Sequence, residues 1–227
     1  MFIPLRDENP ITRFPVVTVA LIAVNTAVFL FQAATPHGLE LAAVRFGAVP
    51  YAITHFRSLP EAAAFPPLLT LLTSMFLHGS LFHLLGNMLY LWIFGNNIED
   101  RLGPVRFGVF YLVCGVVAAL THILFEPGSR IPMIGASGAI AGVLGAYWVL
   151  FPRARVKTFI FLIFYIDVVA IPAGIVLGIW FLLQILNVGM GGGVAWFAHI
   201  GGFLAGILLI RLALGRGFGR RAGTARI

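Results

Sequence analysis

The chain has 227 residues, of which 60% are hydrophobic and only 10% are charged, and its mean hydropathy is +0.99. Soluble domains carry roughly 25% charged residues, so this composition excludes a water-soluble globular protein and indicates an integral membrane protein. The net charge of +7 does not indicate a nucleic-acid partner, because the basic residues lack the aromatic interleaving of such a surface. The single cysteine, Cys114, excludes an internal disulfide framework and a multi-cysteine metal site.

Six stretches of the chain approach the length of about 20 apolar residues that a spanning helix needs. The first begins at Val16, after a mixed-charge segment, and its length suits an uncleaved first span better than a signal peptide. In chain order, the expected spans are 16–33, 68–94, 105–125, 135–151, 170–188 and 194–214. We therefore expect one membrane domain over residues 1–227, an all-α bundle of six transmembrane helices.

A further apolar stretch, Thr158 to Asp167, precedes the fifth span. Joined to that span, it would give about 31 apolar residues, which is too many for one crossing. Pro172 is well placed as an early helix residue. We therefore expect residues 158–169 to form an interfacial segment, with Asp167 near the membrane surface.

The basic residues orient this bundle. With six spans, both termini share one side of the membrane with the second and fourth connections. That side holds all of the 15 Lys and Arg residues except Arg45, Arg57 and Arg130. The positive-inside rule then predicts that both termini are cytoplasmic.

The unusual polar residues then fall in the outer leaflet. Ser137 lies at the start of the fourth span, and His199 lies about five residues into the sixth, ~7–8 Å deep at 1.5 Å per residue. The second span carries His78, His83 and Asn87 through its outer half. Each residue alone has a structural explanation, as a small packing residue or a polar contact between helices. Their convergence at one depth favours a functional site.

Two pairs of glycines predict how the fourth and sixth spans meet. Small residues four positions apart let helices approach closely, and such pairs are present in both spans: Gly138 and Gly142, and Gly202 and Gly206. If these faces meet, the serine and the histidine come side by side at the outer end. A nucleophile needs its base at about 2.6–3.2 Å.

The expected chemistry is nucleophilic catalysis. A serine hydroxyl becomes an effective nucleophile when a base takes its proton, and a neutral His199 can do so. Asn87, His83 and the free backbone N–H groups at the start of the fourth span can donate to an oxyanion. The acidic residues near membrane depth are expected on the other side, so we predict a Ser–His dyad.

Two other motifs are excluded. GASGA, residues 135–139, is not the G-x-S-x-G elbow, because Ala139 fills the last glycine position. A zinc site of His78, His83 and His199 is disfavoured, because i,i+5 is poor helical spacing for two ligands and H-E-x-x-H is absent. We therefore expect no metal.

Four motifs resemble those of the rhomboid intramembrane serine proteases: GASG (135–138), AHIGGFLAG (198–206), HGSLFHLLGN (78–87) and GNNIEDRLG (95–103). The resemblance covers nearly the whole chain and implies a rhomboid-like bundle of six helices that needs no cofactor. It implies that Ser137 is the nucleophile and His199 the general base. It also implies that His83 and Asn87 support the oxyanion and that Gly135 shapes the loop before the serine.

The resemblance further implies structural support from His78 and from Glu99 and Arg101, which are similar to an acidic–basic pair after the second span. The implied partners are the lipid bilayer and single-pass transmembrane proteins, cleaved in or near their membrane helices after small residues. Some well-known members carry an aromatic residue four positions after the serine, where this chain has Ala141. The sequence therefore leaves open what orients the His199 ring, with Trp196 and Phe197 as candidates.

Two alternatives come from other classes of protein. A catalytically silent rhomboid-like protein that binds membrane clients is disfavoured by the presence of both Ser137 and His199. A small transporter would have a broken helix or inverted repeats near mid-membrane, which the sequence does not indicate. We expect a bacterial inner (plasma) membrane protein whose site lies near the outer face.

Overall fold

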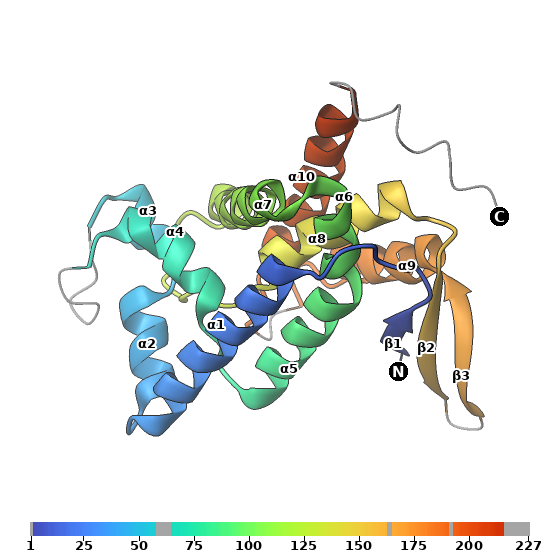
Figure 1. Ribbon diagram of the computed structural model, residues 1–227. Helices are drawn as coiled ribbons and strands as arrows, with labels where there is room; N and C mark the ends of the chain where they lie inside the picture. Colours follow the sequence, from blue (N-terminus) through green and yellow to red (C-terminus); the bar gives the residue numbers. More distant parts are fainter. Residues whose placement is uncertain (1, 58–64, 163–164, 191–192, 216–227) are drawn as a thin grey trace.

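The computed structural model describes all residues except 1, 58–64, 163–164, 191–192 and 216–227 (Figure 1). Within the described residues the chain is mostly helical, and a small antiparallel sheet lies beside the helices (Figure 1). The helices are α1 (Val16–Ala34), α2 (Gly38–Phe46), α3 (Pro50–Thr54), α4 (Thr70–Thr73), α5 (Leu81–Tyr90), α6 (Asn96–Leu102), α7 (Pro104–Phe125), α8 (Ser137–Leu150), α9 (Ala173–Leu186) and α10 (Trp196–Gly215). The strands are β1 (Phe2–Asp7), β2 (Arg155–Leu162) and β3 (Tyr165–Pro172).

Three described helices are long and apolar enough to cross a membrane, namely α1, α7 and the part of α10 over Trp196–Ala213. A fourth crossing is possible if Pro67–Phe76 and Leu81–Leu102, which are bent by 80° at their junction, count as one span. The two remaining expected spans are the 14-residue helices α8 and α9. At 1.5 Å per residue each is ~21 Å long, shorter than the roughly 30 Å hydrocarbon core. Helix length therefore supports three or four crossings in the described chain, not the expected six.

The second expected span is not one continuous helix over 68–94. It begins with short helical turns, Pro67–Leu69, α4 and Ser74–Phe76, and breaks before α5. Ser80 starts α5 as its N-cap, because its Oγ accepts a hydrogen bond from the His83 backbone N–H at 3.1 Å. From α5 the helix continues through the π-helical turn Leu91–Gly95 into α6. The connection between the second expected span, 68–94, and the third, 105–125, is therefore mostly helical, and only Gly103, with a φ of 78°, separates α6 from α7.

The segment expected at the membrane interface, 158–169, folds as part of a β-hairpin. Strands β2 and β3 pair antiparallel from Arg155 opposite Pro172 to Leu162 opposite Tyr165, and β1 adds to the other edge of β2. Both strands are rich in β-branched and aromatic residues, which favour extended structure. The fifth helix accordingly begins at Ala173 rather than at 170, and the all-α expectation is wrong for this part of the chain.

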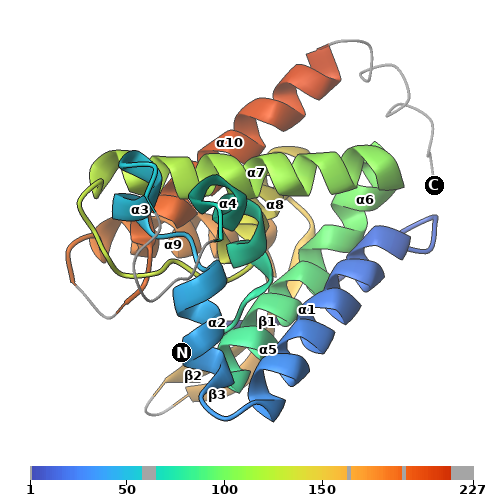
Figure 2. The same cartoon turned by 90° about the vertical axis from the view of Figure 1, so that its left-hand side faces the viewer.

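Helix α8 is the centre of the bundle. Every residue from Ala139 to Tyr147 is buried, and α7 and α10 pack against α8 and against each other (Figure 2). The contact between α8 and α10 is close because glycines face backbone. A Cβ on Gly206 would overlap the Gly142 carbonyl oxygen, and one on Gly202 would overlap that of Gly138. The two glycine faces thus lie against each other.

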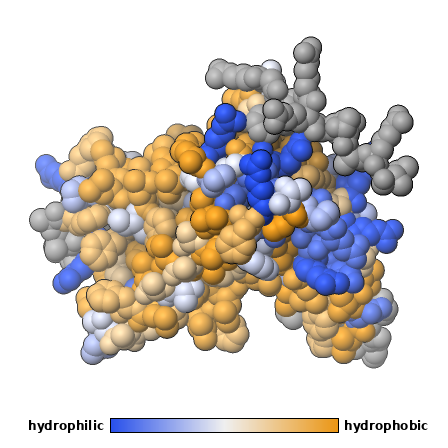
Figure 3. All heavy atoms as spheres, viewed as in Figure 1, coloured by the Kyte–Doolittle hydropathy of each residue, from blue (hydrophilic) through white to orange (hydrophobic). Residues whose placement is uncertain are grey.

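The surface is largely apolar. Hydrophobic residues cover the face formed by α1, α2 and α5, and hydrophilic residues gather around α6 and the sheet (Figure 3). Phe31, Phe82, Val105 and Leu124 are each at least three-quarters exposed. Exposed side chains of this size and kind are suited to contact with lipid acyl chains, in keeping with an integral membrane protein.

Candidate active site

Ser137 and His199 are in direct contact. Ser137 is the first residue of α8, and His199 lies in the first turn of α10. The His199 Nε2 atom is 2.8 Å from Ser137 Oγ. Both side chains are half-buried. The close approach of α8 and α10 at the facing glycines places these two residues together.

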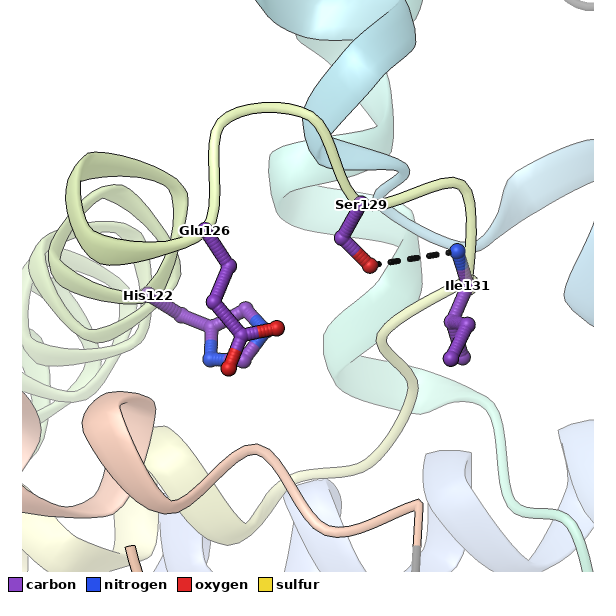
Figure 4. A network of polar contacts seen from close by, with 4 residues as sticks. All are labelled: His122, Glu126, Ser129 and Ile131. Carbon is purple, nitrogen blue, oxygen red and sulfur yellow. Dashed lines mark hydrogen bonds and ion pairs between the residues drawn. The ribbon is translucent and has the colours of Figure 1, made fainter. Parts of the chain in front are cut away.

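The loop before Ser137 makes polar contacts among the described residues. Figure 4 shows Glu126 beside His122 at the end of α7, with their carboxylate Oε2 and ring Nε2 atoms 3.9 Å apart. Farther along the loop, the Ile131 N–H donates to Ser129 Oγ at 3.3 Å. The loop then reaches Gly135, whose N–H donates to the Ser74 carbonyl at 2.9 Å. The hydrogen bond between Gly135 and Ser74 anchors the chain two residues ahead of the candidate nucleophile.

Gly135 brings α5 close to the start of α8. Its φ is 120°, a backbone conformation that residues with a side chain rarely adopt. A Cβ at Gly135 would lie 2.7 Å from His83 Nε2 and 3.6 Å from Asn87 Nδ2. His83 and Asn87 are therefore next to the backbone that leads into Ser137.

Asn87 presents an unused donor at this point. It is 8% exposed, and its Nδ2 has no hydrogen-bond partner among the residues that the structure describes. The first backbone N–H groups of α8 also lack acceptors within the helix. Buried donors without partners are suited to bind a developing negative charge.

His78 lies behind this group. It is fully buried, and its ring is 5.0 Å from that of His83, edge to face. Its backbone N–H donates to Gln32 Oε1 of α1 at 3.3 Å. Neither ring nitrogen has a partner in the described part of the chain, so the structure assigns the ring a packing contact with His83.

Glu99 and Arg101 lie on α6, away from these residues, and they form no ion pair with each other in the described structure. Glu99 instead caps the N-terminus of α1. Its carboxylate accepts hydrogen bonds from the Val17 N–H at 2.8 Å, the Thr18 N–H at 2.7 Å and the Thr18 hydroxyl at 2.8 Å. A carboxylate at a helix N-terminus is favourable for the helix dipole, so the structural role of Glu99 is to join α6 to α1.

A small cavity opens beside Ser137. Its volume is about 40 Å³, and much of its lining is formed by small residues of α7 and α8. They are Gly115, Ala118, Ala119, Gly138 and Ala139. This volume exceeds the roughly 10–15 Å³ that one water molecule needs, so the cavity can hold water or a small side chain.

Two residues of α9 that no sequence motif indicated, Gln184 and Trp180, also surround His199. The Nδ1 atom of His199 is 2.8 Å from Gln184 Oε1. The Trp180 ring centroid is 5.9 Å from that of His199, and Trp196 lies edge-on at 6.0 Å. The sequence carried one signal for Gln184, since it is the only amide or charged side chain in α9.

The expected candidates for the His199 ring are partly in place. Trp196 contacts the ring, whereas Phe197 stacks on Phe125 at 4.4 Å. Ala141 is fully buried and lies against Gly202 of α10. Within the described chain, no three or more His, Cys, Asp or Glu side chains are grouped to hold a metal ion.

Comparison with known proteins identifies a family. Residues 67–216 match the model of the Rhomboid domain. The chain is 31% identical over 149 residues to Rhomboid protein 1, mitochondrial, of Saccharomyces cerevisiae, and 34% identical over 148 residues to RHOMBOID-like protein 1 of Arabidopsis thaliana. It is 35% identical over 145 residues to the mouse Presenilin-associated rhomboid-like protein, mitochondrial.

These alignments cover 61–62% of this chain but only 33–40% of the three relatives. The chain therefore shares the membrane domain with longer proteins, and the activities of the whole relatives are not transferred by the alignment.

The comparisons contradict the expected location. The relatives are eukaryotic proteins of yeast, plants and mammals, and several are named as mitochondrial. The expectation of a bacterial inner membrane is therefore wrong. Charge distribution orients the spans, but it does not distinguish a bacterial membrane from an organelle membrane.

Proposed function

The chain belongs to the rhomboid family, and on that premise we propose that it is an intramembrane serine endopeptidase that uses Ser137 and His199 as a dyad. The observation that carries the proposal is the 2.8 Å contact between His199 Nε2 and Ser137 Oγ. This distance lies within the range that a nucleophile and its base require.

The proposed reaction proceeds through an acyl-enzyme. His199 Nε2 takes the hydroxyl proton as Ser137 Oγ attacks the scissile carbonyl carbon, and the carbonyl oxygen becomes an oxyanion. Collapse of this intermediate breaks the C–N bond, and His199 returns the proton to the leaving amine. Water, deprotonated by His199, then attacks the ester and releases the carboxyl product and the free serine.

The oxyanion is proposed to bind between α5 and α8. Asn87 Nδ2 is a buried donor without a partner in the described chain, and Gly135, in the loop that leads into α8, lies next to it. His83 completes the group from the same face of α5. Such donors act only on charge that develops in the transition state, so they lower the barrier rather than tighten substrate binding.

The proposed substrates are single-pass transmembrane proteins in the lipid bilayer. A fully hydrogen-bonded helix hides its carbonyl groups, so the substrate helix must unwind locally before attack. The cavity of about 40 Å³ beside Ser137 supports cleavage after a residue with a small side chain. We propose no cofactor, metal ion or nucleic acid for this reaction.

The direct test is cleavage in proteoliposomes. Wild-type protein is expected to cut members of a panel of labelled single-pass proteins, with the cut sites read by mass spectrometry. Ser137→Ala and His199→Ala are expected to abolish cleavage, while their far-UV circular dichroism and thermal unfolding stay close to wild type. A fluorophosphonate probe is expected to label wild type and not Ser137→Ala. Labelling that survives this substitution would place the nucleophile elsewhere.

A second candidate is a catalytically silent membrane protein that binds clients. It is compatible with the family match, because a match to the Rhomboid domain does not by itself show activity. The two candidates differ in one measurement. A silent protein would retain the same substrates in wild type and Ser137→Ala, with neither form cutting them or reacting with the probe.

We also propose that the protein forms one membrane domain in which six helical segments cross, with α8 and α9 as short crossings. Single cysteines at Ser129 and Arg153, in a Cys114→Ala background, test the crossing of α8 between them. In sealed vesicles, a membrane-impermeant maleimide is expected to label only one of the two positions from outside. Equal labelling of both would show that α8 does not cross.

A further inference from the structure

We propose that Gln184 is a positioning residue that holds the His199 ring in the tautomer able to take a proton from Ser137. The inference rests on the proposed function of the dyad. Three successive contacts support it: Gln184 with Trp180, Gln184 with His199, and His199 with Ser137.

The contact with Trp180 fixes the orientation of the Gln184 amide. Its Nε2 is 2.7 Å from the Trp180 carbonyl oxygen, one turn earlier in α9. A carbonyl oxygen only accepts hydrogen bonds, so the amide nitrogen must be the atom on that side. The Oε1 atom therefore faces away from the helix axis and toward α10.

The contact with Gln184 fixes which ring nitrogen of His199 carries the proton. Gln184 Oε1 is 2.8 Å from His199 Nδ1. An amide oxygen only accepts, so Nδ1 must carry the hydrogen and donate it. In a neutral imidazole, Nε2 is then the nitrogen with the lone pair.

This tautomer is the one that can act as a base for Ser137. His199 Nε2 is 2.8 Å from Ser137 Oγ, so the lone pair faces the hydroxyl that must lose its proton. With the other tautomer, an N–H would point at the serine, and His199 would be a donor rather than a base. In the Ser-His-Asp triad an aspartate has this orienting task; here the neutral amide has it.

The burial of Gln184 supports this role. The residue is 6% exposed in a helix that is otherwise apolar. Burying an amide is costly unless its atoms are hydrogen-bonded, and here both amide atoms have partners on opposite sides. Packing alone would be served by a leucine. The ring of Trp180, also from α9, lies 5.9 Å from the His199 ring and limits its rotation.

The test compares two substitutions of Gln184 in the full chain in proteoliposomes. Gln184→Leu keeps similar volume and removes the acceptor, whereas Gln184→Glu keeps an oxygen in its place. We expect Gln184→Leu to lower kcat about 10- to 100-fold, as the loss of one buried hydrogen bond implies, with KM nearly unchanged. Gln184→Glu is expected to keep kcat within about tenfold of wild type, because a carboxyl oxygen also accepts from Nδ1.

Asn187 supplies a matched control. It ends the same helix, and its Nδ2 donates to the Leu183 carbonyl at 2.6 Å, as Gln184 donates to Trp180. Asn187→Leu therefore loses the same kind of local bond without touching His199, and its kcat is expected to equal wild type. If Gln184→Leu keeps the wild-type kcat and loses only thermal stability, Gln184 is a packing residue and the inference is wrong.

A spectroscopic measurement does not depend on turnover. Nitrogen-15 NMR of histidine-labelled wild-type protein, with His199 assigned by comparison with His199→Ala, reports which ring nitrogen carries hydrogen. A protonated Nδ1 and bare Nε2 are expected in wild type and Gln184→Glu, and the opposite assignment in wild type would overturn the inference. If wild type neither cleaves nor reacts with a fluorophosphonate, the proposed function fails. The NMR measurement of the His199 tautomer still tests the contact between Gln184 and His199 in that case.

Discussion

The Asn87 side chain offers the clearest single-residue test of the proposed oxyanion site. Its Nδ2 is buried without a partner in the described chain and lies beside the loop that leads to Ser137. Asn87→Ala is expected to lower kcat by about 10²-fold, the usual cost of removing one oxyanion donor, with little change in KM. The measurement is steady-state cleavage of a single-pass substrate by the purified variant.

Asn25 provides the control for that substitution. It is also a buried asparagine, but its Nδ2 donates to Leu21 within α1 at 2.8 Å. Asn25→Ala is expected to keep the kcat of the folded protein. Equal losses in the two variants would mean that Asn87 acts through stability rather than on the oxyanion.

Gly135 is required by its backbone conformation as well as by space. At a φ of 120°, with a Cβ that would lie 2.7 Å from His83 Nε2, Gly135→Ala is expected to strain the loop by about 1–3 kcal/mol. The predicted result is a lower thermal unfolding temperature and a loss of cleavage. Gly128→Ala in the same loop has open space and an ordinary φ, so its unfolding temperature and activity should match wild type.

At the scale of helices, the contact between α8 and α10 decides whether the dyad forms. A Cβ on Gly206 would overlap the Gly142 carbonyl oxygen, so Gly206→Ala must push the two helices apart. We predict a large loss of activity and of fluorophosphonate labelling, because Ser137 and His199 lie on these two helices. Labelling rate per folded protein is the measurement.

Gly86 of α5 is the matched helical glycine, since a Cβ there meets nothing within 4 Å. Gly86→Ala is expected to be neutral or slightly stabilising, by up to about 1 kcal/mol, because alanine favours helix over glycine. A similar loss of labelling in both variants would contradict the importance of the α8–α10 contact.

The helices also show how much patterns along the chain can predict. The glycine pairs predicted a close contact between the fourth and sixth spans, and Gly142 and Gly206 do lie against each other. The break before α5 was not predicted, because residues 68–94 are apolar throughout and the N-cap at Ser80 resembles any other serine. The hairpin at 155–172 was also not predicted. In a chain expected to be an integral membrane protein, an apolar stretch was interpreted as a helix or as an interfacial segment.

At the scale of the whole molecule, Asp7 joins the sheet to the bundle. Its Oδ2 accepts from the Tyr147 hydroxyl at 2.7 Å and from Asn97 Nδ2 at 2.9 Å. Burial is the largest effect on this carboxyl and raises its pKa above the usual value. The folded protein therefore holds the Asp7 proton more tightly than the unfolded chain does.

This shift predicts a pH dependence of stability. The contribution of Asp7 is fully present below the unfolded pKa of about 3.9 and is lost as pH rises through the raised folded value. Asp7→Asn, whose amide oxygen can accept both hydrogen bonds, should gain stability relative to wild type as pH rises from about 4 to about 7. Thermal unfolding of both proteins in detergent across this range is the measurement. A stability difference between the two proteins that stays constant across this range would contradict the prediction.

The sequence by itself determined the membrane class, the family resemblance and the candidate pair Ser137 and His199. These depend on composition and on short motifs, which are local properties of a chain. The location in a bacterial membrane was not determined in this way, because charge asymmetry orients spans without naming the membrane that holds them.

Only the tertiary structure decided which groups surround the dyad. Gln184 and His199 lie on different helices and share no motif, so their 2.8 Å contact exists only once α9 has packed beside α10. In the same way, Glu99 was expected to belong to an acidic–basic pair with Arg101 and instead caps α1, a helix far from it in sequence. Partners of this kind depend on which helix faces pack together. The pattern of apolar residues does not determine this, because a helix face that contacts lipid and one that packs on another helix are both apolar.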